Sequence, residues 1–179
     1  GRLLALAAVV AASVTVVSGG CQTYNYNPVG VCVIQPGTQQ VKLSDISTAD
    51  LLFVAVKSYQ TEDAVRGAAS VIGPRTWILS TQNGIGNVEQ IRRAVGSDRI
   101  LTGITFHSIQ HTGPNRMRYR TGIKPIQMAP IDGRITEEVL AICDRFRAAG
   151  LAAEVVENVD AAVWQKLVHN AVVNPVSAL

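Results

Sequence analysis

Three polar side chains recur every four residues near the end of the chain: Lys166, Asn170 and Asn174. In an α-helix four residues advance by about 400°, so these side chains would form a stripe about 80° wide and about 12 Å long. One ammonium group and two amides in a row could protonate one oxygen of a small ligand and hold others. An ordinary solvated helix face has the same pattern, so the stripe alone leaves both interpretations open.

The helix expected around this stripe has its own start and stop signals. Asn158-Val-Asp160 is expected to cap it, and Trp164 and Leu167 predict an apolar face that packs on a neighbour. Pro175 directly follows Asn174. Because proline restricts the residue before it and cannot continue normal helix geometry, we expect a kink or stop that aims Asn174 into a cleft.

Two successive predicted strands deliver polar side chains at one sheet edge. The strand expected over residues 50–56 is apolar after Asp50, as in a central parallel strand, and leads into Lys57. Residues 74–80 form the next expected strand, which is followed by Asn83. Ligands of open α/β sheets bind beyond the carboxyl ends of strands, so Lys57 stands where a phosphate could bind. A solvated lysine and an ordinary tight turn at Asn83 are the alternatives.

The elements around these strands predict an α/β fold. Helices are expected over residues 61–72 and 88–95, joined to the strands by short loops as in a doubly wound sheet. We expect strands over residues 100–109, 115–121 and 124–128 to form an antiparallel edge on a mostly parallel sheet.

The final part of the sheet is expected to alternate helix and strand. Residues 135–149 form an amphipathic pattern opened by Thr136 and closed by Gly150, and a last strand follows over residues 151–157.

The apolar run at residues 3–17 has three interpretations. It is shorter than the roughly 20 residues that span a bilayer. A lipoprotein signal ending before Cys21 is conceivable, but Arg2 is the single basic residue ahead of the run. We favour a buried helix over residues 2–12 that feeds a strand over residues 13–17, as in the second half of a βαβ unit.

A hairpin is expected after this run. Residues 29–34 and 39–43 predict two short strands around a turn at Pro36-Gly37.

Composition excludes several classes of function. The chain is 47% apolar and 16% charged, which is typical of a globular core-forming domain. A net charge of +3 and 5% aromatic residues give no basic stacking platform for nucleic acid. Arg116, Arg118 and Arg120 alternate like the outer face of a strand. Nucleic acid and membrane are therefore not expected as partners.

The cysteines and histidines give no metal pattern. Cys21, Cys32 and Cys143 are widely spaced, and the latter two lie in apolar runs, as expected of buried free thiols in a cytoplasmic protein. His107 and His111 fall in a strand and a turn without a third ligand, so no metal is expected.

Four motifs together resemble one enzyme family. Residues 50–61, Gln82-Asn-Gly-Ile-Gly86, Gly103-Ile-Thr105 and residues 164–178, which end in Asn-Pro-Val-Ser-Ala, occur in the order found in ketopantoate reductases (2-dehydropantoate 2-reductases). The resemblance implies a Rossmann-type domain that binds NADPH and a helical substrate domain. On this basis residues 1–158 are a partial NADP-binding domain, and residues 159–179 begin the all-α C-terminal domain.

The resemblance also implies a role for each candidate residue. Lys166 is expected to be the general acid that protonates the ketone oxygen during NADPH-dependent reduction of 2-dehydropantoate to pantoate, in pantothenate biosynthesis. Asn170 and Asn174 are expected to bind the substrate. Asn83 is expected at both substrate and nicotinamide, and Lys57 at the adenosine phosphate. The expected partner is a small-molecule keto acid, the expected assembly a homodimer and the expected compartment the cytoplasm.

Several departures from the family pattern leave alternatives open. A G-x-G-x-x-G loop is absent, with Gly1 interpreted as its remnant. Gly19 occupies the place of the family's arginine, which leaves NADP against NAD open, and Ile109 replaces a usually small residue. Another hydroxyacid dehydrogenase and a non-catalytic nucleotide-binding protein are the alternatives.

Both ends of the chain are interpreted as cut. The sequence has no initiator methionine and closes at Leu179 within or just after a helix. Because the Gly-rich loop and most of the helical domain would then be missing, we expect the isolated chain to show no ketopantoate reduction.

Overall fold

The computed structural model describes residues 6–10, 13–16, 22–26, 29–33, 48–106, 108–113, 116–120 and 124–177. The predictions for Gly1, Gly19, Cys21, His107 and a strand over 39–43 lie outside these residues.

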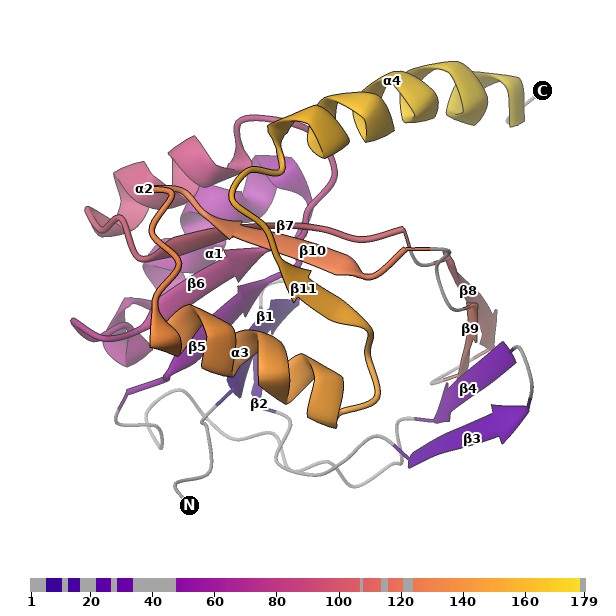
Figure 1. The fold of residues 1–179 in the computed structure, drawn as a ribbon, viewed down its shortest axis with the longest axis horizontal. Helices are drawn as coiled ribbons and strands as arrows, with labels where there is room; N and C mark the ends of the chain where they lie inside the picture. Colours follow the sequence, from indigo (N-terminus) through magenta and orange to yellow (C-terminus); the bar gives the residue numbers. More distant parts are fainter. Residues whose placement is uncertain are drawn as a thin grey trace.

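A seven-stranded sheet runs through the centre of the fold in the order β11-β10-β7-β6-β5-β1-β2 (Figure 1). Strand β5 (Leu51–Val54) lies between β1 (Leu6–Val10) and β6 (Trp77–Ser80), parallel to both. Strand β7 (Ile100–Ile104) continues the parallel arrangement beside β6. The expected mostly parallel, Rossmann-like α/β sheet is therefore confirmed.

Helices cover both faces of this sheet (Figure 1). Helices α1 (Thr61–Gly67) and α2 (Asn87–Val95) lie on one face, and α3 (Glu137–Ala148) lies on the other. Successive strand residues point to opposite faces, so each strand supplies two separate cores. The first core joins Leu52 and Ile78 to Val65 of α1 and Ile91 of α2. This double burial explains why β5 is apolar throughout.

The second core lies beneath α3. It joins Leu79 and Leu101 to Val139, Ile142 and the free thiol of Cys143, whose expected burial is confirmed.

The ends of α3 follow the sequence signals. The Thr136 hydroxyl accepts a hydrogen bond from the Val139 amide at 3.4 Å, and Gly150 has a φ of 82° just after the helix. Strand β11 (Ala153–Val155) then pairs in parallel with β10 (Ile126–Pro130).

The helix predicted over residues 2–12 is wrong for Leu6–Val10, which forms strand β1. This strand pairs in parallel with β5 and antiparallel with β2 (Ser13–Val16). A short apolar run without clear periodicity suits a buried strand as well as a buried helix. Here the long-range pairing with β5 outweighs the helix propensity of alanine and leucine.

The three strands predicted as one antiparallel edge are wrong in their grouping. Residues 100–109 divide between β7 and β8 (Ser108–Gly113). β8 and β9 (Arg116–Arg120) belong to a separate sheet, of order β3-β4-β9-β8, while β10 alone pairs antiparallel with β7. Local pattern indicated these strands but not their partners, because β4, which pairs with β9, lies far away in the sequence. Arg118 is exposed, as expected for an outer face.

The hairpin prediction is confirmed for one strand and corrected for its partner. β4 (Val29–Val33) exists, but it pairs with β3 (Gln22–Tyr26) on one side and β9 on the other. Both edges of β4 are thereby occupied by described strands.

Helix α4 (Asp160–Ser177) projects beyond the sheet (Figure 1). Of the kink or stop predicted at Pro175, the stop is wrong, because the helix runs through that residue. Proline in the last turn removes one hydrogen bond near a helix end, which the helix tolerates. The capping interaction is confirmed, since the Asn158 side chain accepts from the Asp160 amide at 2.6 Å.

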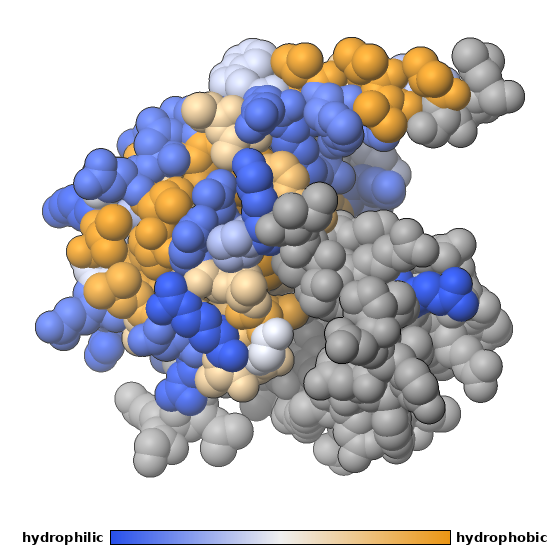
Figure 2. All heavy atoms as spheres, turned by 45° about the vertical axis from the view of Figure 1, so that its right-hand side comes forward, coloured by the Kyte–Doolittle hydropathy of each residue, from blue (hydrophilic) through white to orange (hydrophobic). Residues whose placement is uncertain are grey.

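Of the two residues expected to pack the apolar face of α4, Leu167 is half-buried but Trp164 is not. Trp164 is 55% exposed, and Val168, Val172 and Val176 are exposed along the same helix, as the apolar surface in Figure 2 shows. The reason is geometric, since most of α4 lies past the sheet that would have covered it.

Among the described residues, no helix is both long enough and apolar enough to span a bilayer.

Candidate active site

Lys166 reaches from α4 to the connection that follows β7. Its Nζ donates a hydrogen bond to the backbone oxygen of Thr105 at 2.5 Å. The same Nζ lies 5.8 Å from the centre of the Phe106 ring. Burial lowers the pKa of Lys166 below the usual range for lysine. An ammonium group held this way is a stronger proton donor than a lysine in open solvent.

Lys166, Asn170 and Asn83 line one small cavity. Its volume of about 20 Å³ is enough for about one water-sized group. Gly103 of β7 forms part of its wall. The structure therefore brings Lys166 and Asn170 close to Asn83, although they are far from it in the sequence.

Asn174 does not join this group. It is exposed on the part of α4 that projects beyond the sheet, and it does not line the small cavity. The expectation that Pro175 would aim Asn174 into a cleft is not met by the described residues, because the helix continues without a stop.

Lys57 and Asn83 meet at the predicted edge of the sheet. Both line a larger cavity of about 470 Å³ at the ends of β5 and β6. The Ser58 hydroxyl donates to the backbone oxygen of Asn83 at 3.3 Å, which joins the two loops directly. The predicted convergence of these strand ends is confirmed.

The residues of this larger cavity suit a nucleotide. Its volume lies within the roughly 300–1,000 Å³ typical of small-molecule sites. Lys57 offers an ammonium group for a phosphate, while Ser58, Gln60 and Asn83 offer donors and acceptors for a ribose or an amide. A phosphorylated dinucleotide therefore fits the chemistry of the groups present.

Gln82 was missed as a functional candidate by the sequence analysis. Its Nε2 donates to the Val56 backbone oxygen at 2.7 Å and to the Thr61 hydroxyl at 2.9 Å. Its Oε1 accepts from the Ser80 hydroxyl at 3.0 Å. Its place directly before Asn83, after a strand end, was the available signal.

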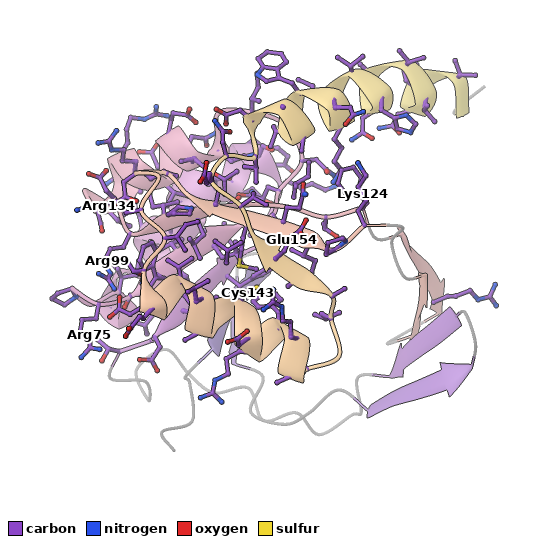
Figure 3. The ribbon with its side chains drawn as sticks, in the orientation of Figure 1. Arg75, Arg99, Lys124, Arg134, Cys143 and Glu154 are labelled. Carbon is purple, nitrogen blue, oxygen red and sulfur yellow. The ribbon has the colours of Figure 1, made fainter. Side chains whose placement is uncertain are left out.

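Lys124 and Phe106 were also missed. Lys124 Nζ lies 5.3 Å from the centre of the Phe106 ring, the same ring that Lys166 faces. Figure 3 shows Lys124 on the side of the molecule where α4 lies. Lys124 is exposed and does not line the small cavity, so it adds positive charge beside the site rather than inside it.

A third cavity of about 380 Å³ lies between α2 and the start of α4. Glu89 and Asp160 line it, each in the first turn of its helix. Carboxylates in that position stabilise the positive end of a helix dipole, which accounts for their presence.

The part of the chain that the structure describes contains no group of three or more His, Cys, Asp or Glu side chains arranged to hold a metal ion.

Comparison of the sequence with known proteins identifies the family of the chain. A profile of the family described as "Ketopantoate reductase PanE/ApbA" matches residues 5–133. The chain belongs to the ketopantoate reductase family. It is 38% identical over 131 residues to a 2-dehydropantoate 2-reductase of Pyrococcus horikoshii, a match that covers 73% of this chain and 42% of that protein. The chain thus spans less than half the length of this relative.

Solved ketopantoate reductases share the fold. A PanE/ApbA family ketopantoate reductase from Ralstonia eutropha JMP134 is similar with a TM-score of 0.60 and 27% identity, covering 74% of this chain and 44% of that one. A D-mandelate dehydrogenase, solved with NADH and anilino(oxo)acetate, is similar with a TM-score of 0.61 and 24% identity, covering 73% of this chain and 42% of that one. The second likeness supports the fold alone.

Proposed function

We propose that the full-length gene product reduces 2-dehydropantoate to pantoate with NADPH, as a cytoplasmic enzyme of pantothenate biosynthesis. The observation that carries this proposal is the half-buried Lys166 ammonium beside the same small cavity as Asn83 and Asn170. Family membership supports the reaction. The buried free thiol of Cys143 agrees with a reducing compartment.

Lys166 is the proposed general acid. Reduction of a ketone develops negative charge on its oxygen, and a positioned ammonium stabilises that charge and supplies the proton. The lowered pKa of Lys166 eases the transfer near neutral pH. The Thr105 carbonyl holds the ammonium in place before the substrate arrives, through the hydrogen bond at 2.5 Å.

Asn83 and Asn170 are the proposed substrate contacts. Each amide offers two donors and one acceptor without adding charge, which suits the hydroxyl and carboxylate oxygens of a hydroxy or keto acid. Asn174 belongs to the same helix face, and its part in substrate binding remains a prediction.

NADPH is the cofactor that we propose, and it supplies the hydride when bound. Lys57 would hold its adenosine phosphate, and Asn83 would contact its nicotinamide end, both from the edge of the sheet where their cavity lies. The ammonium group of Lys57 in that cavity supports a phosphorylated ligand.

The two-domain organisation is a further part of the proposal. Residues 1–158 would form the nucleotide-binding part, and residues 159–179 would begin a helical substrate domain. The exposed valines and Trp164 of α4 support this division, because such a stripe normally packs against other helices.

Steady-state kinetics of the full-length gene product tests the proposed function. We expect oxidation of NADPH with 2-dehydropantoate, and much slower turnover with phenylglyoxylate, the keto acid of mandelate. Faster turnover with phenylglyoxylate would favour another hydroxyacid dehydrogenase. Nucleotide binding without turnover of either keto acid would favour a non-catalytic nucleotide-binding protein.

Reversing the charge of Lys57 should weaken the binding of NADPH more than the binding of NADH. Lys57→Glu places a carboxylate beside the extra phosphate of NADPH, so we expect its Kd to rise by about tenfold or more, equivalent to about 1.4 kcal/mol. Titration of both cofactors by fluorescence measures the difference. Arg75→Glu is the control, because Arg75 is 85% exposed at the side chain and lies just before β6, away from this edge. If the Kd values of both cofactors rise equally, Lys57 does not contact the extra phosphate of NADPH.

The homodimer expected from the sequence stays a prediction. Sedimentation velocity of the full-length gene product at several concentrations would test it.

A further inference from the structure

The Gln82 carboxamide connects three separate pieces of backbone at the edge of the sheet. Its Nε2 donates to the Val56 carbonyl after β5 at 2.7 Å and to the Thr61 hydroxyl at the start of α1 at 2.9 Å. Its Oε1 accepts from the Ser80 hydroxyl at the end of β6 at 3.0 Å. Both amide hydrogens and the carbonyl oxygen are thus used, which fixes the side chain in one orientation.

The residue next to Gln82 is the proposed substrate and nicotinamide contact. The backbone oxygen of Asn83 accepts from Ser58 at 3.3 Å and from the Asn87 side chain at 3.2 Å. The loop that carries Asn83 is therefore tied to the loop that carries Lys57 by Ser58 as well as by Gln82. Gln82 also lines all three cavities around this edge.

We propose that Gln82 is a positioning residue that sets Asn83 relative to Lys57 and so couples dinucleotide binding to placement of the keto acid. This inference rests on the proposed function for its substrate. Gln82 is not assigned any contact with the reacting atoms. It acts through the two loops that its carboxamide joins, and a misplacement of about 1 Å at such a site can cost on the order of 10²-fold in rate.

The polarity of this clamp explains why glutamine suits the position. A carbonyl oxygen at 2.7 Å requires a donor, while the Ser80 hydroxyl at 3.0 Å is served by an acceptor. A carboxamide carries both a donor and an acceptor on the same carbon atom. Methionine has a similar length but offers neither a donor nor a strong acceptor, so Gln82→Met removes the clamp with little change in volume.

Thr76 provides a matched control, because it lies just before β6 whereas Gln82 lies just after it. Its hydroxyl is buried near the start of β6, where it donates to the Ala49 carbonyl at 2.6 Å and accepts from the Gly73 amide at 2.9 Å. Thr76→Val removes a comparable set of buried hydrogen bonds before β6 begins, whereas Gln82 follows the end of that strand. Loss of stability alone should therefore affect both variants, but loss of positioning should affect only Gln82→Met.

The experiment compares kcat, KM for 2-dehydropantoate, Kd for NADPH and Tm of the full-length gene product and both variants. We expect Gln82→Met to lower kcat by about 10- to 100-fold with a smaller change in the Kd of NADPH. We expect Thr76→Val to lower Tm by about as much as Gln82→Met does. Its kcat should stay within about threefold of the wild-type value, because Thr76 is remote from the site. Equal kcat values for the two variants would overturn the proposal.

A second variant covers the case in which Gln82→Met fails to fold. Thr61→Val removes one partner of the clamp and leaves Gln82 in place. We expect a smaller kcat loss in Thr61→Val, and coupling rather than additivity when it is combined with Gln82→Met. Wild-type kcat in Thr61→Val, together with additive effects in the double variant, would contradict the clamp.

A measurement without turnover separates this inference from the proposed function. The side-chain amide signals of Asn83 in NMR spectra should shift on NADPH addition in the wild type and in Thr76→Val, but less in Gln82→Met. If this difference is seen and 2-dehydropantoate is not reduced, the proposed function fails and the positioning role stands. If all three proteins shift alike, the positioning role fails whatever the substrate.

Discussion

Replacing Lys166 with alanine is expected to lower kcat for 2-dehydropantoate by about 10²- to 10⁴-fold, the usual contribution of a general acid. The ammonium that would protonate the ketone oxygen is lost, while the cavity that holds Lys57 does not contain Lys166. The Kd of NADPH should therefore stay within about twofold. Steady-state kinetics and a fluorescence titration measure the two quantities.

The pH dependence of the wild type should carry the same signature. Burial lowers the pKa of Lys166, and only its protonated form can donate. Turnover should therefore fall as pH rises through that lowered pKa, below the value of about 10.4 for a free lysine. Lys166→Ala should lack this step. A kcat profile that is identical in shape for both proteins would contradict the general-acid role.

The stability of Lys166→Ala should not fall for electrostatic reasons. A lysine with a lowered folded pKa binds fewer protons in the folded than in the unfolded state between the two pKa values. The free energy of unfolding therefore rises with pH between the two pKa values. At pH values below both, the folded protein bears the cost of burying the charged ammonium. Removing the ammonium relieves this cost at neutral pH, and the Tm of Lys166→Ala checks that a lower kcat does not come from unfolding.

Lys124→Ala is the matched control for this prediction. Lys124 faces the same Phe106 ring, with its Nζ 5.3 Å from the ring centre, but it is exposed and lies outside the small cavity. We expect its loss to change kcat by less than about fivefold, as for a screened surface charge. A loss equal to that of Lys166→Ala would indicate a general effect of positive charge rather than proton donation.

The edge of the central sheet could be predicted because its signals are local. Apolar strands that end in Lys57 and in Asn83 place both side chains at the carboxyl edge of a parallel sheet, and the structure confirms that they share a cavity. The helical spacing of Lys166 and Asn170 was likewise confirmed by their common cavity with Asn83. Periodicity and strand direction were sufficient for these placements.

The parts that could not be predicted depend on distant partners. The run Leu6–Val10 forms a strand because β5 offers it a parallel edge, which a local pattern cannot show. β8 and β9 leave the main sheet for the same reason, since β9 pairs with the distant β4 and β8 pairs with β9. Gln82 escaped notice because its role depends on three contacts that converge only after folding, at Val56, Thr61 and Ser80.

The position of Asn174 shows a different limit. Helical spacing correctly places it in line with Lys166, but spacing does not say how far the rest of the protein extends along that line. In the described structure α4 passes the end of the sheet before it reaches Asn174, which is exposed.

Adding one methyl group at Gly103 is expected to damage both the fold and the site. A Cβ at this position of β7 would lie 2.7 Å from Thr81 Cγ2, 3.0 Å from Leu79 Cδ1 and 3.3 Å from the Ser80 carbonyl oxygen. Something must move, and overpacking of this kind costs about 1–3 kcal/mol of unfolding free energy. Gly103→Ala should therefore lower Tm by roughly 2–4 °C per kcal/mol in a chain of this size.

The effect on turnover follows from what the methyl group displaces. Thr81 directly precedes Gln82 and Asn83, and all three line the small cavity together with Lys166. We expect kcat of Gly103→Ala to fall by about tenfold or more, because a small displacement of Asn83 loosens the site. Gly67→Ala is the control, since nothing lies within 4 Å of a Cβ at the last residue of α1. It should leave kcat unchanged and hold or slightly raise Tm.

A second-site change can test the proposed cause directly. Thr81→Ser removes Cγ2, the nearest atom to the added methyl group, and keeps the hydroxyl. In the double variant we expect part of the lost Tm and kcat to return, because the contact at 2.7 Å no longer exists. Leu79 Cδ1 and the Ser80 oxygen remain close, so recovery should be incomplete. The prediction would be contradicted if Tm and kcat do not recover in the double variant. It would also be contradicted if Gly103→Ala is as stable and active as Gly67→Ala, since β7 would then not require glycine beside the loop that carries Asn83.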